Sequence, residues 1–138
     1  MCQNDDRRVF QADADSLPAV LTFVLEAAEK AGVPLSRLPH LELAVDETLT
    51  NIIRYAYRGD FGKVEVRVTA DDRDYMVEFA DRGAAFNPLS APPPDLSTDL
   101  ANRKPGGLGI FFTRQMVDDV EYRRDEDRNV LTLVMRLP

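Results

Sequence analysis

Three polar residues in the segment 39–57 have types and spacing that could act together in chemistry. Glu47, Asn51 and Arg54 follow one another at intervals of four and three residues, which stacks them along one ridge of a helix. A carboxylate can accept a proton, an amide oxygen can bind a hard cation, and a guanidinium can pair with phosphate. The same pattern is also typical of a solvated helix face without any chemistry.

The helix that would carry this ridge is predicted from Pro39 or His40 to Tyr57, where Arg58-Gly59-Asp60 ends the pattern. At about 100° per residue, its apolar residues fall on one side and the three polar residues fall on the opposite side. The apolar side consists of Leu41, Val45, Leu49, Ile52 and Ala56.

A second candidate is Asp81, which follows a strand predicted at 75–80. By the two-residue period of a strand, Asp81 shares the face of Tyr75 and Phe79, so its carboxylate is aimed at the apolar layer and needs a partner. The exocyclic amine of a purine would be such a partner, and Gly83 would let the backbone pass close to the ring. The alternative is that this Asp-x-Gly segment only begins a turn.

A third candidate is the glycine cluster of Gly106, Gly107 and Gly109, just before an apolar helix predicted at 109–117. Such glycines allow unusual backbone conformations, and a helix start offers free N–H groups to phosphate. A flexible hinge would have the same composition. The chain has no P-loop, because the glycines and the lysine of the segment 59–63 have the wrong spacing.

Around these motifs the periodicity predicts strands, one more helix and a long connection. The connection, 82–105, is rich in proline and has no sustained period, which is typical of a lid or a binding loop. The helix is expected to start at the capping hydroxyl of Ser16 and to stop at Gly32. Strands are predicted at 8–12, 64–69, 75–80, 120–123 and 130–137, with polar turns at 71–74 and 125–128.

These elements predict an α/β (α+β) two-layer sandwich, with helices on one face of a mixed, mostly antiparallel sheet. The 138 residues, 44% of them hydrophobic, suffice for one domain spanning 1–138. The net charge of -7 argues against direct binding of nucleic acid. A charged N-terminus and the lack of a long apolar run predict a cytoplasmic protein without a membrane segment. One cysteine, Cys2, and one histidine, His40, exclude zinc clusters and Cys/His catalysis.

The order of the three motifs resembles the N, G1 and G2 boxes of the histidine-kinase-like ATPases, whose ATP-binding domain is the Bergerat fold. The stand-alone length and the Glu-x-x-x-Asn-Ile-Ile-Arg-Tyr-Ala-Tyr segment are most similar to the anti-sigma factor serine kinases within that superfamily. The similarity runs from the first strand to Leu137. The matching segments are Glu47 to Tyr57, Asp81 to Pro88 and Gly106 to Ile110.

The resemblance implies a role for each matching residue. Glu47 would be the general base, Asn51 the Mg²⁺ ligand and Arg54 a cation that steadies phosphate. Asp81 would read adenine, with Gly83 beneath the ring. The other residues implied at the nucleotide are Phe86, Lys104, Gly106, Gly107, Leu108, Gly109, Ile110 and Thr132, the last as a late-strand threonine near adenine.

The predicted lid also contains two basic residues, Arg103 and Lys104. The resemblance implies that both approach the triphosphate, and the alternative is that they are ordinary solvated charges.

The resemblance also implies a function. We expect an anti-sigma factor that binds Mg²⁺ and ATP, transfers the γ-phosphate to a serine of an anti-anti-sigma antagonist, and otherwise sequesters a sigma factor, with homodimers common in the family. One alternative is a non-catalytic module that holds ATP and acts by capturing a partner. Another is a sandwich that binds no nucleotide, which would leave the inward orientation of Asp81 unexplained.

Overall fold

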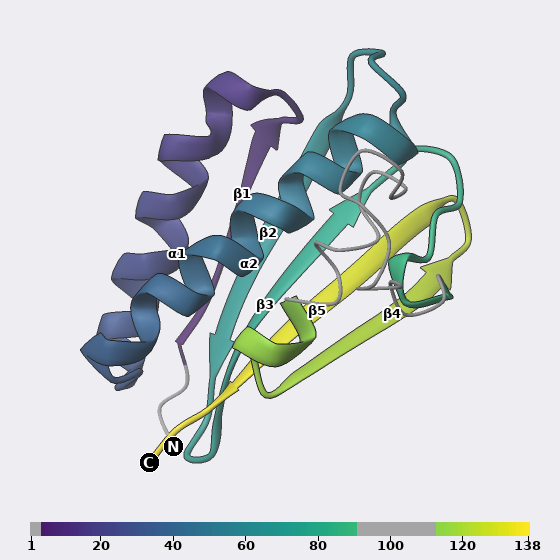
Figure 1. The fold of residues 1–138 in the computed structure, drawn as a ribbon. Coiled ribbons are helices and arrows are strands. Elements are labelled where there is room, and N and C mark those ends of the chain that lie inside the picture. Colours follow the sequence, from purple (N-terminus) through teal and green to yellow (C-terminus); the bar gives the residue numbers. More distant parts are fainter. Residues whose placement is uncertain (1–3, 91–112) are drawn as a thin grey trace, which may run out of the picture.

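The computed structural model describes residues 4–90 and 113–138, in which helices α1 and α2 cover one face of a five-stranded sheet (Figure 1). The strands are β1 (Asn4–Gln11), β2 (Lys63–Ala70), β3 (Asp74–Asp81), β4 (Asp119–Asp125) and β5 (Arg128–Arg136). Their order is β1-β2-β3-β5-β4, and all of these neighbours pair antiparallel. The two-layer sandwich is confirmed, while the expected mixed sheet is purely antiparallel among the described strands.

Helix α1 (Leu17–Ala31) follows a short 3₁₀ turn, Ala14–Ser16. The cap here is Asp13, whose carboxylate accepts from both the backbone N–H and the hydroxyl of Ser16 at 2.9 Å. The prediction that the Ser16 hydroxyl caps the helix is therefore wrong, because that hydroxyl donates outward to Asp13. The helix stops at Gly32 as predicted, with φ 104° and its N–H donating to the carbonyl oxygens of Ala28 and Glu29.

Helix α2 (Leu38–Asn51) runs directly into a π-helical turn, Ile52–Ala56. In this wider turn the N–H of Tyr57 donates to the carbonyl oxygen of Ile52 at 3.0 Å. At its end the carbonyl oxygen of Ala56 accepts from the N–H of Ala84 at 2.8 Å, which joins the helix to the segment after β3. Single π turns inside helices occur frequently at functional sites.

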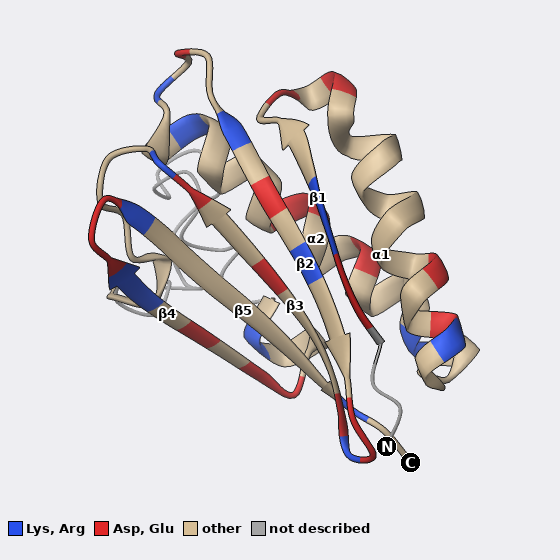
Figure 2. Ribbon diagram, turned by 180° about the vertical axis from the view of Figure 1, so that it is seen from behind, with Lys and Arg blue, Asp and Glu red and all other residues tan. Residues whose placement is uncertain are grey.

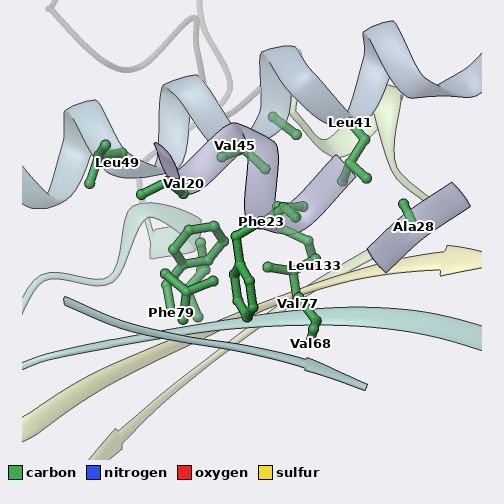
Figure 3. Packing of buried hydrophobic residues seen from close by; sticks show 14 of the residues in the cluster. Val20, Phe23, Ala28, Leu41, Val45, Leu49, Val68, Val77, Phe79 and Leu133 are labelled. Atoms are coloured by element: carbon green, nitrogen blue, oxygen red, sulfur yellow. The ribbon is translucent and has the colours of Figure 1, made fainter. Parts of the chain in front are cut away.

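The core lies between the two helices and the inner face of the sheet, where apolar side chains from both layers interdigitate (Figure 3). Tyr75 brings a hydroxyl into this layer and donates it to the carbonyl oxygen of Val24 at 2.7 Å. Burial raises the pKa of Tyr75, so this donor stays protonated. The labelled core residues are Val20, Phe23, Ala28, Leu41, Val45, Leu49, Val68, Val77, Phe79 and Leu133.

The opposite face of the sheet is not covered by either helix and carries interspersed acidic and basic residues (Figure 2). Arg67 on β2 makes a bidentate pair with Asp5 on β1, at 3.0 and 2.8 Å. Arg123 on β4 lies 3.9 Å from Glu78 on β3. These cross-strand pairs are those expected where one face of an antiparallel sheet meets water.

Two predicted elements lie partly outside the described residues. Of the helix expected at 109–117, residues 113–116 are helical and Val117 is not. Of the connection at 82–105, only 82–90 is described, and it contains a 3₁₀ turn at Pro88–Ser90. Among residues 4–90 and 113–138, no helix is both long and apolar enough to cross a bilayer.

Candidate functional site

A cavity lies between the sheet and α2, at the end of β3. It brings together residues that are far apart in the chain, from α2, β3, β4, β5 and the segment after β3. Three residues predicted for the site, Asn51, Asp81 and Phe86, line it together. The full lining is Thr48, Asn51, Ile52, Ala56, Asp81, Phe86, Pro88, Thr113, Tyr122, Asn129 and Leu131.

Asp81 is the buried carboxylate of this cavity, with 3% of its surface exposed. The strand alternation predicted this inward orientation correctly. Its Oδ1 accepts two hydrogen bonds of 2.9 Å, from Asn129 Nδ2 and from the N–H of Gly83. Burial raises the pKa of Asp81, while these two donors and the nearby Arg124 act in the opposite direction. No donor among the described residues reaches Oδ2, so this oxygen can still accept a hydrogen bond.

Asn51 is 6% exposed, and its Oδ1 is buried without a hydrogen-bond partner among the described residues. The prediction that Asn51 lies opposite the apolar side of the helix is therefore wrong. Asn51 lies at the border of the buried arc, beside Thr48 and Ile52, which line the same cavity. An orphaned buried acceptor costs about 1–3 kcal/mol, which a ligand that binds the oxygen would offset. A hard cation such as Mg²⁺ fits an amide oxygen of this kind.

The other two residues of the predicted ridge have different environments. Glu47 lies one turn before Asn51 and is half-buried. Burial raises the pKa of Glu47, Asp46 raises it further, and Arg54 lowers it. Arg54 itself is exposed, and neither Glu47 nor Arg54 is among the described residues that line the cavity. The ridge therefore divides into one buried, one half-buried and one exposed side chain.

Close packing within the protein requires glycine at position 83. A Cβ atom at this position would lie 2.6 Å from the backbone carbon and oxygen of Ala56. Only glycine lets the segment after β3 approach the π turn closely enough for the Ala84 N–H to reach the Ala56 oxygen. The predicted proximity of Gly83 to a purine ring stays a prediction.

Phe86 lines the cavity and stacks on Tyr55, with ring centroids 4.9 Å apart and planes 23° apart. Its backbone N–H donates to Asn129 Oδ1 at 3.1 Å. Because the ring packs on the π turn and the backbone is tied to β5, Phe86 connects the two layers that enclose the cavity.

Thr132 is not brought to this site. Asp81 pairs with Asn129 across the sheet, and Leu131 and Leu133 share that inner face. Thr132 is one residue out of phase, so it lies on the outer face, paired with Glu78 and Glu121. The assignment of Thr132 to the nucleotide is therefore corrected, because on this strand Asn129 and Leu131 line the cavity.

Comparison with known proteins identifies the family of this chain. The family described as Histidine kinase-like ATPase domain matches residues 10–135. The chain belongs to this family. The match covers every element that lines the cavity.

Named relatives of this histidine kinase-like ATPase domain are protein kinases. Serine/threonine-protein kinase BtrW of Bordetella bronchiseptica is 33% identical over 94 residues, which are 67% of this chain and 66% of the relative. Serine-protein kinase RsbW of Bacillus thuringiensis is 23% identical over 124 residues, 87% of this chain and 78% of the relative. The chain thus spans about two thirds to four fifths of the relatives it matches.

A solved structure supports the same fold for this ATPase domain. The crystal structure of the RsbU and RsbW domains of Rv1364c from Mycobacterium tuberculosis superposes with a TM-score of 0.67 at 17% identity. The superposition covers 97% of this chain and 32% of the other. At this identity the likeness concerns the fold alone.

Several residues predicted for the candidate site lie outside the described part of the chain. They are Arg103, Lys104, Gly106, Gly107, Leu108, Gly109 and Ile110. Their roles stay predictions.

Four residues at the cavity are not predicted from the sequence. Asn129 and Tyr122 form a hydrogen bond of 2.5 Å next to Asp81. Thr113 and Thr48 are buried in the lining, and Thr48 donates its hydroxyl to the carbonyl oxygen of Ala44 at 2.8 Å. Asn129 had one available signal, since it is in phase with Leu131 and Leu133 and therefore shares their buried face.

Proposed function

We propose that this chain is an ATP-binding anti-sigma factor and protein serine kinase that, with Mg²⁺, transfers the γ-phosphate of ATP to a serine of an antagonist protein. The observation that carries the proposal is the pairing, in one cavity, of an orphaned amide oxygen on Asn51 with a half-satisfied carboxylate on Asp81. Among the described residues, the Asn51 oxygen is buried without a partner and no donor reaches the second oxygen of Asp81, so both can accept a ligand group.

Asp81 would bind the base of the nucleotide. With Oδ1 filled by Asn129 and Gly83, Oδ2 would accept from the exocyclic amine of adenine. The apolar part of the lining, which includes Ile52, Phe86 and Leu131, would pack against a purine ring. A carboxylate oxygen that still accepts a hydrogen bond favours a donor over an acceptor at this point of the base.

Asn51 would hold Mg²⁺ through Oδ1, the oxygen that has no partner among the described residues. Bound there, the ion would neutralise phosphate charge and align the triphosphate. Arg54, exposed after Asn51 in the π turn, would add a cation near the phosphates. The glycine cluster Gly106, Gly107 and Gly109, with Leu108, Ile110 and Lys104, belongs to the same proposal on the strength of its motif.

Glu47 would accept the proton of the attacking serine hydroxyl. It lies one helical turn from Asn51, so a hydroxyl directed at a metal-bound phosphate would come close to its carboxylate. Because burial raises its pKa, Glu47 is a stronger base than an exposed glutamate. A general base in this position would act only after a partner protein has delivered its serine.

The partners in this proposal are a sigma factor and a serine-bearing antagonist, supported by the resemblance to anti-sigma factor kinases and by the names of the kinase relatives. Residues 1–138 would form one cytoplasmic domain, which could pair as a homodimer. With a net charge of -7, it would act on transcription through these proteins and not through nucleic acid.

The test is incubation of the purified chain with γ-labelled ATP, Mg²⁺ and candidate antagonists encoded beside it. We expect label on one serine of the antagonist and none when Mg²⁺ is chelated. Thermal unfolding with and without Mg-ATP accompanies it. A thermal shift without transfer would replace the kinase by a module that only binds ATP, and the absence of any shift would overturn nucleotide binding itself.

A further inference from the structure

Asn129, on β5, uses all of its hydrogen-bonding capacity inside the protein. It is 4% exposed. Its Nδ2 donates to Asp81 Oδ1 at 2.9 Å and to the carbonyl oxygen of Ala84 at 2.8 Å. Its Oδ1 accepts from the Tyr122 hydroxyl at 2.5 Å and from the Phe86 N–H at 3.1 Å. Two donors and two lone pairs are the full inventory of an amide.

This network determines the orientation of the Asn129 amide, that is, which positions its oxygen and its nitrogen occupy. Rotating it by half a turn would place its NH₂ against the N–H of Phe86, which can only donate. It would also place its oxygen against the Asp81 carboxylate and the Ala84 carbonyl, which are both acceptors at neutral pH. The amide therefore has one satisfied orientation, in which a donor always faces Asp81 Oδ1.

The consequence for Asp81 is that its two oxygens are no longer equivalent. Oδ1 receives Asn129 Nδ2 from β5 and the N–H of Gly83 from its own segment. A partial turn about the Cβ–Cγ bond would strain both hydrogen bonds, and a half turn would only exchange two identical oxygens, so one oxygen always holds both donors. Oδ2 is thereby kept as the acceptor that remains for a ligand in the cavity.

We propose that Asn129, oriented by Tyr122, is a positioning residue for base selection: it holds Asp81 so that Oδ2 accepts from the amine of a 6-aminopurine nucleotide. This inference rests on the proposed function, in which Asp81 binds adenine. A 6-oxopurine would present an acceptor to the same oxygen, so it would be rejected. A site built around one hydrogen bond discriminates strongly against an analogue that cannot make it.

The test measures dissociation constants for ATP and for purine riboside 5′-triphosphate, which differ only by the exocyclic amine. For the unaltered protein we expect ATP to bind roughly tenfold or more tightly. Asn129→Leu should bring this ratio close to one. Tyr122→Phe, which removes a single hydroxyl and leaves the packing intact, should give an intermediate ratio. GTP, measured alongside, should gain affinity relative to ATP in both variants.

The matched control is Thr132→Val, on the same strand but on the outer face of the sheet, where the ratio should not change. A purely structural role for Asn129 would weaken both triphosphates equally and leave the ratio at its original value, which would overturn the inference while the proposed function stands. Equal binding of the two triphosphates by the unaltered protein would instead refute the contact between Asp81 and the amine. Tyr122→Phe decides between these outcomes if Asn129→Leu does not fold.

Discussion

Asp5 and Asp81 each accept two hydrogen bonds, yet their pKa values shift in opposite directions. On the outer face of the sheet, the bidentate bond from the Arg67 guanidinium lowers the pKa of Asp5. In the cavity, burial raises the pKa of Asp81, although Asn129 and Gly83 bond to it at similar distances. The number of hydrogen bonds does not decide the shift. The direction of the pKa shift depends on the charge of the partner and on the access of water.

The two carboxylates differ in their readiness to bind a ligand. Asp5 has an oppositely charged partner and water, so it gains little from further contacts. Asp81 has neutral donors on one oxygen and none from the described residues on the other. A carboxylate kept in this state costs folding stability, which the protein would recover when a ligand supplies the missing donor.

The largest effect is expected at a third carboxylate, Glu47, whose pKa is also raised by burial. Glu47→Gln should lower the rate of phosphoryl transfer about 100-fold or more, because the proton acceptor is lost. ATP affinity should stay nearly constant, since the variant keeps Asp81 and Asn51. The measurement is single-turnover transfer from labelled ATP. Glu42→Gln, on an exposed position of the same helix, is the control and should transfer normally.

Asp81→Asn removes the buried carboxylate itself. We expect ATP affinity to fall about 10- to 100-fold, the cost of losing a hydrogen bond to a charged group, because an NH₂ would replace the accepting Oδ2. Calorimetric titration with ATP checks this. Asp5→Asn removes the carboxylate of the outer face and should leave ATP binding unchanged. Equal losses in the two variants would show that Asp81 has no particular role.

Gly83→Ala tests the frame that holds Asp81 in place. The added Cβ would lie 2.6 Å from the Ala56 backbone, so the segment after β3 must move. We expect a loss of about 1–3 kcal/mol in the free energy of unfolding, measured by urea denaturation. Arg67→Ala, on the outer face, should have a clearly smaller effect. An unchanged unfolding midpoint for Gly83→Ala would mean that the close contact with the π turn is not needed.

The smallest effect concerns pH. The pKa of Asp81 lies above the ordinary value of 3.8, so Asp81 takes up a proton at a higher pH than an exposed aspartate does. As the pH falls, ATP affinity should therefore begin to decrease earlier, by at most about tenfold per pH unit. For stability the signs differ. The raised pKa of Asp81 removes stability as pH rises through it, whereas the lowered pKa of Asp5 removes stability as pH falls through it. Titrations of ATP affinity and of urea unfolding from about pH 7 down to about pH 2 separate the two, because the lowered pKa of Asp5 lies below the ordinary value of 3.8.

Much of the fold could be predicted because its signals are local. The alternation of apolar residues located β2 and β3, and it also placed Asp81 on the buried face, since one parity fixes a whole strand. Gly32 ended α1 where its left-handed backbone is needed. β1 begins at Asn4, earlier than the expected residue 8, because its charged first half pairs with β2 without any apolar alternation.

The site was harder to predict because it depends on contacts between distant segments. Asn51 was assigned to the wrong side because a polar residue at the edge of an apolar arc is indistinguishable from a solvated one until its neighbours are known. Asn129 follows a polar turn and meets Asp81 only across the sheet, 48 residues away. Thr132 is one residue out of phase with Leu131 and Leu133, so strand parity places it on the outer face, which its similarity to a motif does not reveal.

The π turn at Ile52–Ala56 has a consequence for how the length of this chain can vary. Adding or removing one residue there would rotate Ala56 away from Ala84 and uncouple the helix from the segment after β3. Among the described residues, the exposed loop that follows, at 58–60, bonds only to the adjacent turn, through the N–H groups of Gly59 and Asp60, and does not contact the segment after β3 by a backbone hydrogen bond. Peptide tags, fluorescent reporters and natural insertions should therefore be accommodated at 58–60 and not one turn earlier.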